Sequence, residues 1–164
     1  MTPTQRPSTT VNIQLYRYGE GAHLRGICLG VTRFPPRGVR RDTWSERGLC
    51  DVWLPNLAPS PELVAAFRGG KISFSTFATR YRREMRAPEA RHLIELIAGI
   101  ARLQPVNLGC VCADPTRCHR SLLGKLVEQA QAGLHWRDSL ATAAPDAPRP
   151  FASPPCDMPE IVDD

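Results

Sequence analysis

The stretch VNLGCVCADPTRCHRSLLGKLVEQA, residues 106–130, decides the fold of this chain. It begins with a short apolar run, residues 106–112, that lies between Pro105 and Pro115. An apolar run of that length between two breakers predicts a buried strand. Apolar residues then recur at helical spacing, so a helix is expected over about residues 118–131. The stretch therefore predicts a strand that leads directly into a helix.

The rest of the chain predicts three further strands and three further helices. Apolar patterning indicates strands at residues 11–16, 25–33 and 50–54. Helix-start residues predict helices that open at Ser60, Ser73 and Pro88, and a short helix is expected from Trp44. This order of elements fits an α/β fold, a single small sandwich with a partly parallel sheet flanked by helices.

The two ends of the chain differ from its middle in composition. Residues 1–10 are rich in Thr, Ser and Pro, and residues 137–164 are Pro-rich and acidic. Neither end can bury enough apolar surface to offset its chain entropy, so both are expected to be disordered tails. The single folded domain is expected at residues 11–136.

The folded domain is strongly basic. The whole chain carries +5, and residues 11–136 carry +8 once both tails are set aside. Lys71 and Lys125 are the only lysines, so nearly all of this charge is arginine. Arginine suits bidentate recognition of phosphate, so the expected partner is a phosphate-bearing ligand or nucleic acid. An arginine bias of the source genome would explain the same composition, and this alternative stays open.

No secretory signal opens the chain, and no apolar run reaches membrane-spanning length. We therefore expect a cytoplasmic protein with no membrane partner, in which the six cysteines stay reduced. No cofactor is expected, and the sequence sets no oligomeric state.

The spacing of three cysteines raises the question of a zinc site. Cys110, Cys112 and Cys118 are followed by His119, all within ten residues. Structural zinc sites usually draw their ligands from two separated pairs, often Cys-x2-Cys. Ligands crowded into one strand, turn and helix start predict poor tetrahedral geometry, so no metal is expected. Cys110 is then a small buried hydrophobic residue.

Three residues before and within the predicted helix are candidates for catalysis. Cys118 is expected in the first helical turn beside Arg117, His119 and Arg120, surroundings that lower a thiol pKa and favour a nucleophile or redox-sensitive thiol. Packing beneath the loop is the alternative for Cys118. His119 is either an acid/base group or a partly buried structural histidine. Asp114 is either an acid/base group or a turn residue.

Arginines near the helix start are candidates for ligand binding. Arg120 opposes the helix dipole, so a bound anion or an acidic neighbour such as Asp114 should compensate it. Arg117 is expected to bind the same anion. Arg33 and Arg37 belong to a stiff arginine-rich loop, residues 33–41, and they reach the site only if the strand before them neighbours the strand at residue 106.

Several stretches resemble the domain of unknown function 488 family (YeaO-like). They are Arg37-Gly38-Val39, Trp44, residues 51–60 (DVWLPNLAPS), residues 80–85 (RYRREM), and Cys112 through Cys118-His119-Arg120. The resemblance covers about residues 13–130. It implies a compact cytosolic bacterial α/β domain and little chemistry, because the family is defined without an established activity.

The sequence leaves three hypotheses for function. The first is an enzyme that acts on a nucleotide or nucleic-acid component, with Cys118, His119 and Asp114 as catalytic residues. The second is a non-catalytic nucleotide- or nucleic-acid-binding module that uses the same pocket. The third is a thiol-based redox or partner-binding protein.

Overall fold

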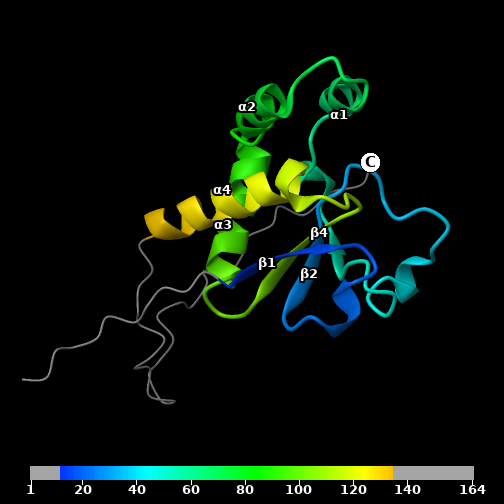
Figure 1. The fold of residues 1–164 in the computed structure, drawn as a ribbon. Helices are drawn as coiled ribbons and strands as arrows, with labels where there is room; N and C mark the ends of the chain where they lie inside the picture. The colour runs from blue at the N-terminus through cyan, green and yellow to red at the C-terminus, as the bar shows by residue number, and fades with distance from the viewer. Residues whose placement is uncertain (1–11, 135–164) are drawn as a thin grey trace, which may run out of the picture. The chain divides into compact units, whose positions relative to one another are not determined.

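The computed structural model describes residues 12–134, and the predicted tails lie outside this range. One sheet forms the centre of the fold, with the strand order β1-β4-β2-β3 (Figure 1). The strands are β1 (Ile13–Arg17), β2 (Ile27–Gly30), β3 (Val52–Trp53) and β4 (Val106–Cys110). The predicted α/β class is confirmed, and every pairing in the sheet is parallel rather than only some of them.

The decisive stretch supplies the central strand β4. All five residues of β4 are buried, and Val106 pairs with Ile13 on one side and with Ile27 on the other. Because β4 lies in the middle of the sheet and residues pointing to either face are buried, both of its faces are covered, which explains its continuous apolar run. The strand ends at Cys110, two residues earlier than expected, because its partner β1 ends opposite at Arg17.

Four helices follow the order that the sequence predicts. They are α1 (Pro61–Arg68), α2 (Phe74–Glu84), α3 (Pro88–Ile100) and α4 (His119–Gly133). The Ser60 and Ser73 side chains cap α1 and α2 by accepting backbone N–H bonds. The prediction of a short helix from Trp44 is wrong. A single 3-10 turn at Arg41–Thr43 ends just before that residue.

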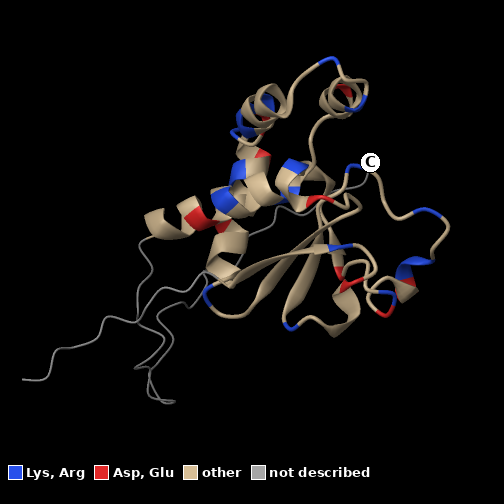
Figure 2. Cartoon of the chain, viewed as in Figure 1, with Lys and Arg blue, Asp and Glu red and all other residues tan. Residues whose placement is uncertain are grey.

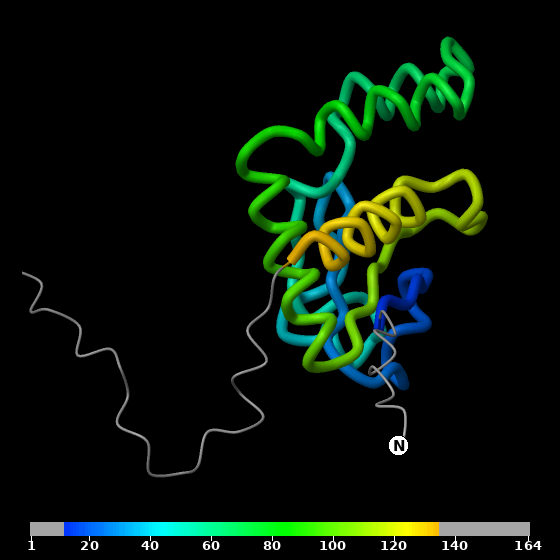
Figure 3. The backbone as a smooth tube through the Cα atoms, turned by 90° about the vertical axis from the view of Figure 1, so that its left-hand side faces the viewer, coloured from blue at the N-terminus to red at the C-terminus, as the bar shows by residue number. Residues whose placement is uncertain are grey.

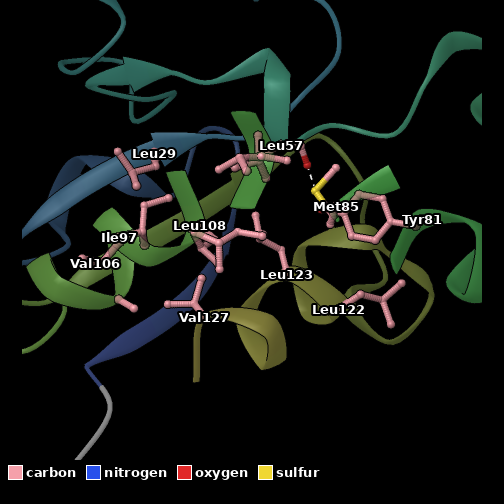
Figure 4. Packing of buried hydrophobic residues seen from close by; sticks show 14 of the residues in the cluster. Leu29, Leu57, Tyr81, Met85, Ile97, Val106, Leu108, Leu122, Leu123 and Val127 are labelled. Carbon is pink, nitrogen blue, oxygen red and sulfur yellow. Dashed lines mark hydrogen bonds between the residues drawn. The ribbon is translucent and has the colours of Figure 1, made fainter. Parts of the chain in front are cut away.

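Helices α3 and α4 cover one face of the sheet (Figures 1 and 3). Leu108 of β4 packs there against side chains such as Ile97 and Leu123 (Figure 4). Helix α2 packs on α1 and also reaches α4. Its fully buried Tyr81 donates a hydrogen bond to the Leu57 carbonyl at 2.7 Å. None of the helices within residues 12–134 combines the length and the apolar character needed to cross a membrane.

The opposite face of the sheet depends on a glycine. The ring of Tyr16, which is 3% exposed, lies directly over Gly109, and its hydroxyl donates to the Leu49 carbonyl. A Cβ atom at position 109 would overlap the tyrosine ring. Glycine at this point of the central strand therefore lets the ring close that face of the sheet.

We expect Gly109→Ala to destabilise the protein by about 1–3 kcal/mol, because the added methyl group overpacks the contact with Tyr16. Urea unfolding followed by circular dichroism measures the change. Gly133→Ala is the matched control, since its Cβ would meet no atom within 4 Å and should change stability by less than about 0.5 kcal/mol. Equal effects of the two variants would contradict this account of the β4 glycine.

Candidate functional site

The candidate site lies at the carboxyl ends of β2 and β4, beside the start of α4. Because β2 pairs with β4, the arginine-rich loop after β2 lies next to the turn after β4. This confirms the strand adjacency on which the roles of Arg33 and Arg37 depended. A pocket of about 620 Å³ opens between these loops and the helices α1 and α2. In open parallel sheets this is where ligands bind.

The pocket is lined by four arginines and by no aspartate or glutamate. The arginines are Arg33, Arg37, Arg68 and Arg117. None of them has a carboxylate within ion-pair distance in residues 12–134. Figure 2 shows basic segments on the loop after β2 and at the start of α4. The pocket is therefore cationic.

Each of three pocket arginines is held by a specific contact. The Arg33 guanidinium donates to the carbonyls of Ala58 and Pro59 at 2.8 and 3.0 Å, which ties the loop to the start of α1. The guanidinium of Arg37 lies over the ring of Phe34, and that of Arg117 lies over Phe67, each at 5.8 Å. These contacts orient the charges without neutralising them.

Aromatic and proline side chains form the apolar part of the lining. Phe34 is 57% exposed and precedes two prolines that stiffen the loop. On the helical side, the rings of Phe67 and Phe77 lie 4.8 Å apart. An exposed ring beside an arginine offers a flat surface on which a planar ligand can stack.

Three thiols converge at the inner end of the pocket. The Sγ atoms of Cys110, Cys112 and Cys118 all lie within 4.8 Å of one another, and the Cys110–Cys112 separation is 3.6 Å. Cys112 is half-buried, whereas the other two are buried. We refer to these three residues as the thiol cluster.

The electrostatics of the thiol cluster differ from the expectation for Cys118. Hydrogen bonds from Cys110 and Cys118, helped by the Arg120 charge, lower the pKa of Cys112. The same shared hydrogen bonds and burial raise the pKa of Cys118, so the predicted lowering at that residue is wrong. The physical reason is that Cys118 is 2% exposed and serves as a donor within the cluster.

His119 is a buried neighbour of the cluster. Its Nε2 lies 2.6 Å from the Val31 carbonyl, a bond in which Nε2–H is the donor. The Nδ1 atom is then the unprotonated nitrogen, and it lies 3.8 Å from Cys118 Sγ. Burial lowers the pKa of His119, so the ring is neutral near pH 7. Its edge meets the ring of Tyr81, which fixes its orientation.

Arg120 and Asp114 are placed differently from the other predicted site residues. Arg120 is 3% exposed, and its Nη1 donates to the carbonyls of Tyr16 and Cys110 at 2.8 and 3.2 Å. Strand-end carbonyls, rather than Asp114, therefore compensate its position at the helix start. Asp114 is exposed and accepts hydrogen bonds from Thr116, which lower its pKa and make it a turn residue. Neither residue lines the pocket.

Sequence reasoning missed several residues of the pocket. Arg68 and Phe67 lie on the last turn of α1, and nothing in their local pattern distinguishes them from an ordinary helix end. Phe34 lies in a loop whose arginines, rather than its aromatic ring, are the signal in the sequence. The exposure of Cys112 follows from the early end of β4, which turns the chain toward the pocket.

The fold and site together define a small parallel α/β domain with an arginine-lined pocket that ends in a thiol cluster. The family model described as the active DUF488-N3 subclade, DUF488-N3a, matches residues 13–131. The chain therefore belongs to the DUF488 family, which confirms the resemblance noted from its sequence.

A curated relative supports the same assignment. The uncharacterized protein YeaO of Escherichia coli K12 is 30% identical over 114 residues, which cover 69% of this chain and 94% of YeaO. No solved structure matches the chain significantly.

We expect Arg120→Ala to destabilise the ligand-free protein by about 1.5–3 kcal/mol. The change leaves two buried carbonyls at the ends of β1 and β4 without their charged donor. Urea unfolding in buffer without phosphate measures the loss. Arg82→Ala, on the exposed face of α2, is the control and should stay within about 0.5 kcal/mol of wild type. An unchanged midpoint for Arg120→Ala would contradict the structural role given to its guanidinium.

Proposed function

We propose that the protein binds a phosphate-bearing ligand with a planar ring, a nucleotide or nucleic-acid component, and presents it to the thiol cluster. The observation that carries this proposal is the lining of the pocket, which combines four arginines with aromatic rings and contains no carboxylate. Uncompensated guanidinium groups favour an anion, and their fork geometry suits phosphate oxygens. The exposed ring of Phe34 suits a nucleobase.

The size of the pocket supports the same class of ligand. A volume of about 620 Å³ is in the range of small-molecule and cofactor sites, which bury most of a ligand's surface. The guanidinium groups of Arg37 and Arg117 lie directly beside aromatic rings of the lining, so a ring and a phosphate can be held together. A free phosphate would use the arginines and leave the aromatic surface unoccupied.

As an enzyme, the protein would act on its ligand at the thiol cluster. Among the residues proposed for catalysis, Cys118 and His119 line the pocket, and Cys112 is the most exposed thiol beside them. A catalytic role for Asp114 remains a prediction without support from its position. A ligand-binding role for Arg120 also remains a prediction, since the guanidinium is engaged with strand carbonyls. A cytoplasmic location, where thiols stay reduced, is part of this proposal.

We expect nucleoside 5′-monophosphates to raise the melting temperature in a dose-dependent way, as any ligand of the native state must. The matching nucleosides and inorganic phosphate, tested alone, should give much smaller shifts. Arg117→Gln should weaken binding about tenfold to hundredfold, the loss of a charged hydrogen bond worth on the order of 1.5–3 kcal/mol. Isothermal titration calorimetry measures the affinities.

Two controls sharpen the experiment. Arg82→Gln on exposed α2 should bind like wild type, and Phe34→Ala should weaken nucleotides while leaving inorganic phosphate unaffected. Equal affinities for wild type and Arg117→Gln would contradict the pocket as the binding site. Binding of single-stranded oligonucleotides with a steep salt dependence, without binding of mononucleotides, would support the nucleic-acid-binding alternative instead.

A further inference from the structure

The thiol cluster brings three cysteine side chains from separate positions of the chain close together. Cys110 ends β4, Cys112 lies in the following turn, and Cys118 is the N-cap residue of α4. Three separate backbone positions thus aim sulfur atoms at one point. From the sequence, ligands crowded into one strand, turn and helix start predict poor tetrahedral geometry, yet the turn between strand and helix brings the three sulfurs together.

The sulfur separations are close to those of a metal thiolate site. Zinc–sulfur bonds are about 2.3 Å long, which places the sulfurs of a tetrahedral site about 3.8 Å apart. The Cys110 and Cys112 sulfurs are 3.6 Å apart, and all three lie within 4.8 Å. A tetrahedral site therefore needs no sulfur–sulfur separation to shorten by more than about 1 Å. Thiolates are soft ligands that select zinc or copper(I) over magnesium or calcium.

A buried charge next to the cluster provides an independent argument. Arg120 is 3% exposed, its Nε has no hydrogen-bond partner, and no carboxylate within residues 12–134 pairs with it. Buried charges are normally compensated by an opposite charge nearby. Three thiolates around a divalent ion carry a net charge of −1. Arg120 donates to the carbonyl of Cys110, so such a group would lie beside it.

We propose that Cys110, Cys112 and Cys118 bind a zinc ion through their three sulfur atoms. His119 Nδ1 lies near Cys118 Sγ but is not among the mutually close ligand atoms, so it stands beside the site rather than in it. All three cysteines line the arginine pocket, so a fourth coordination position left open would be reached from that pocket. Three protein ligands with one open position are the arrangement of catalytic zinc sites.

Binding is a simple exchange of protons for the ion. Every sulfur of the cluster that still carries a proton loses it to solvent as it bonds to Zn²⁺, and no oxidation or reduction takes place. The proposal goes beyond nucleotide binding and does not depend on it, since it concerns only the chain and the ion.

Cobalt(II) is the probe for this site, because thiolate-bound cobalt absorbs strongly where zinc does not. The experiment uses the full chain with Cys156→Ser, freed of metal and kept reduced with a phosphine. We expect one Co²⁺ per chain, with thiolate-to-cobalt charge-transfer absorption and the intense visible bands of tetrahedral cobalt. Added Zn²⁺ should displace the cobalt and abolish both signals. Absence of the charge-transfer band in this protein would overturn the proposal.

Matched cysteine variants locate the ion. Cys112→Ala should lower zinc affinity at least tenfold and remove the tetrahedral cobalt bands, and its half-exposed position makes a folded variant expected. Cys50→Ala changes a buried thiol outside the cluster and should bind cobalt like its parent. Circular dichroism checks the fold of each variant, and Cys112→Ser replaces Cys112→Ala if the latter is unfolded. Unchanged affinity in a folded Cys112 variant would overturn the proposal. Nucleotide binding is measured separately, so either proposal can fail alone.

Discussion

The buried guanidinium of Arg120 connects the elements that build the site. Its Nη1 donates to the last carbonyls of two neighbouring strands, Tyr16 in β1 and Cys110 in β4, from the first turn of α4. The partial positive charge of the helix start repels the guanidinium, but its hydrogen bonds to the strand-end carbonyls offset this repulsion. The helix is thereby fixed against the carboxyl edge of the sheet. That position brings Cys118 back beside Cys110, so the thiol cluster depends on an arginine that does not line the pocket.

The sequence could predict the elements because their patterns are local. The apolar run at Val106 and the capping serines at positions 60 and 73 act within a few residues, and the structure has the strand and both helices there. The strand order is set by contacts between distant segments, as when β4 enters between β1 and β2. No single stretch encodes that insertion, so the sheet was expected to be only partly parallel.

The candidate site was located from the sequence better than its residues were assigned. A strand followed by a helix start, rich in Cys, His and Arg, is found at the carboxyl edge of the sheet, as the pattern predicts. The individual side chains depended on tertiary contacts that spacing does not encode. The Arg120 guanidinium points inward and donates to the carbonyl of Tyr16, 104 residues away in the chain. The side chain of Cys118 is buried. Arg68 of α1 also lines the pocket, although α1 is far in sequence from the strand and helix that indicated the site.

Arginines without a carboxylate partner are found both at the surface of the site and in its interior. At the outer part of the pocket, Arg37, Arg68 and Arg117 face solvent without a carboxylate partner in residues 12–134. Water and salt screen these exposed charges, so leaving them without an anionic ligand costs little free energy. Arg120 has no such screening, and its carbonyl partners supply only partial charges. An anionic group held within the protein would therefore stabilise Arg120 further, whereas an exchangeable one suffices at the exposed arginines. Under the zinc proposal, the cluster of Cys110, Cys112 and Cys118 lies beside Arg120 and supplies that charge as thiolates bound to an ion.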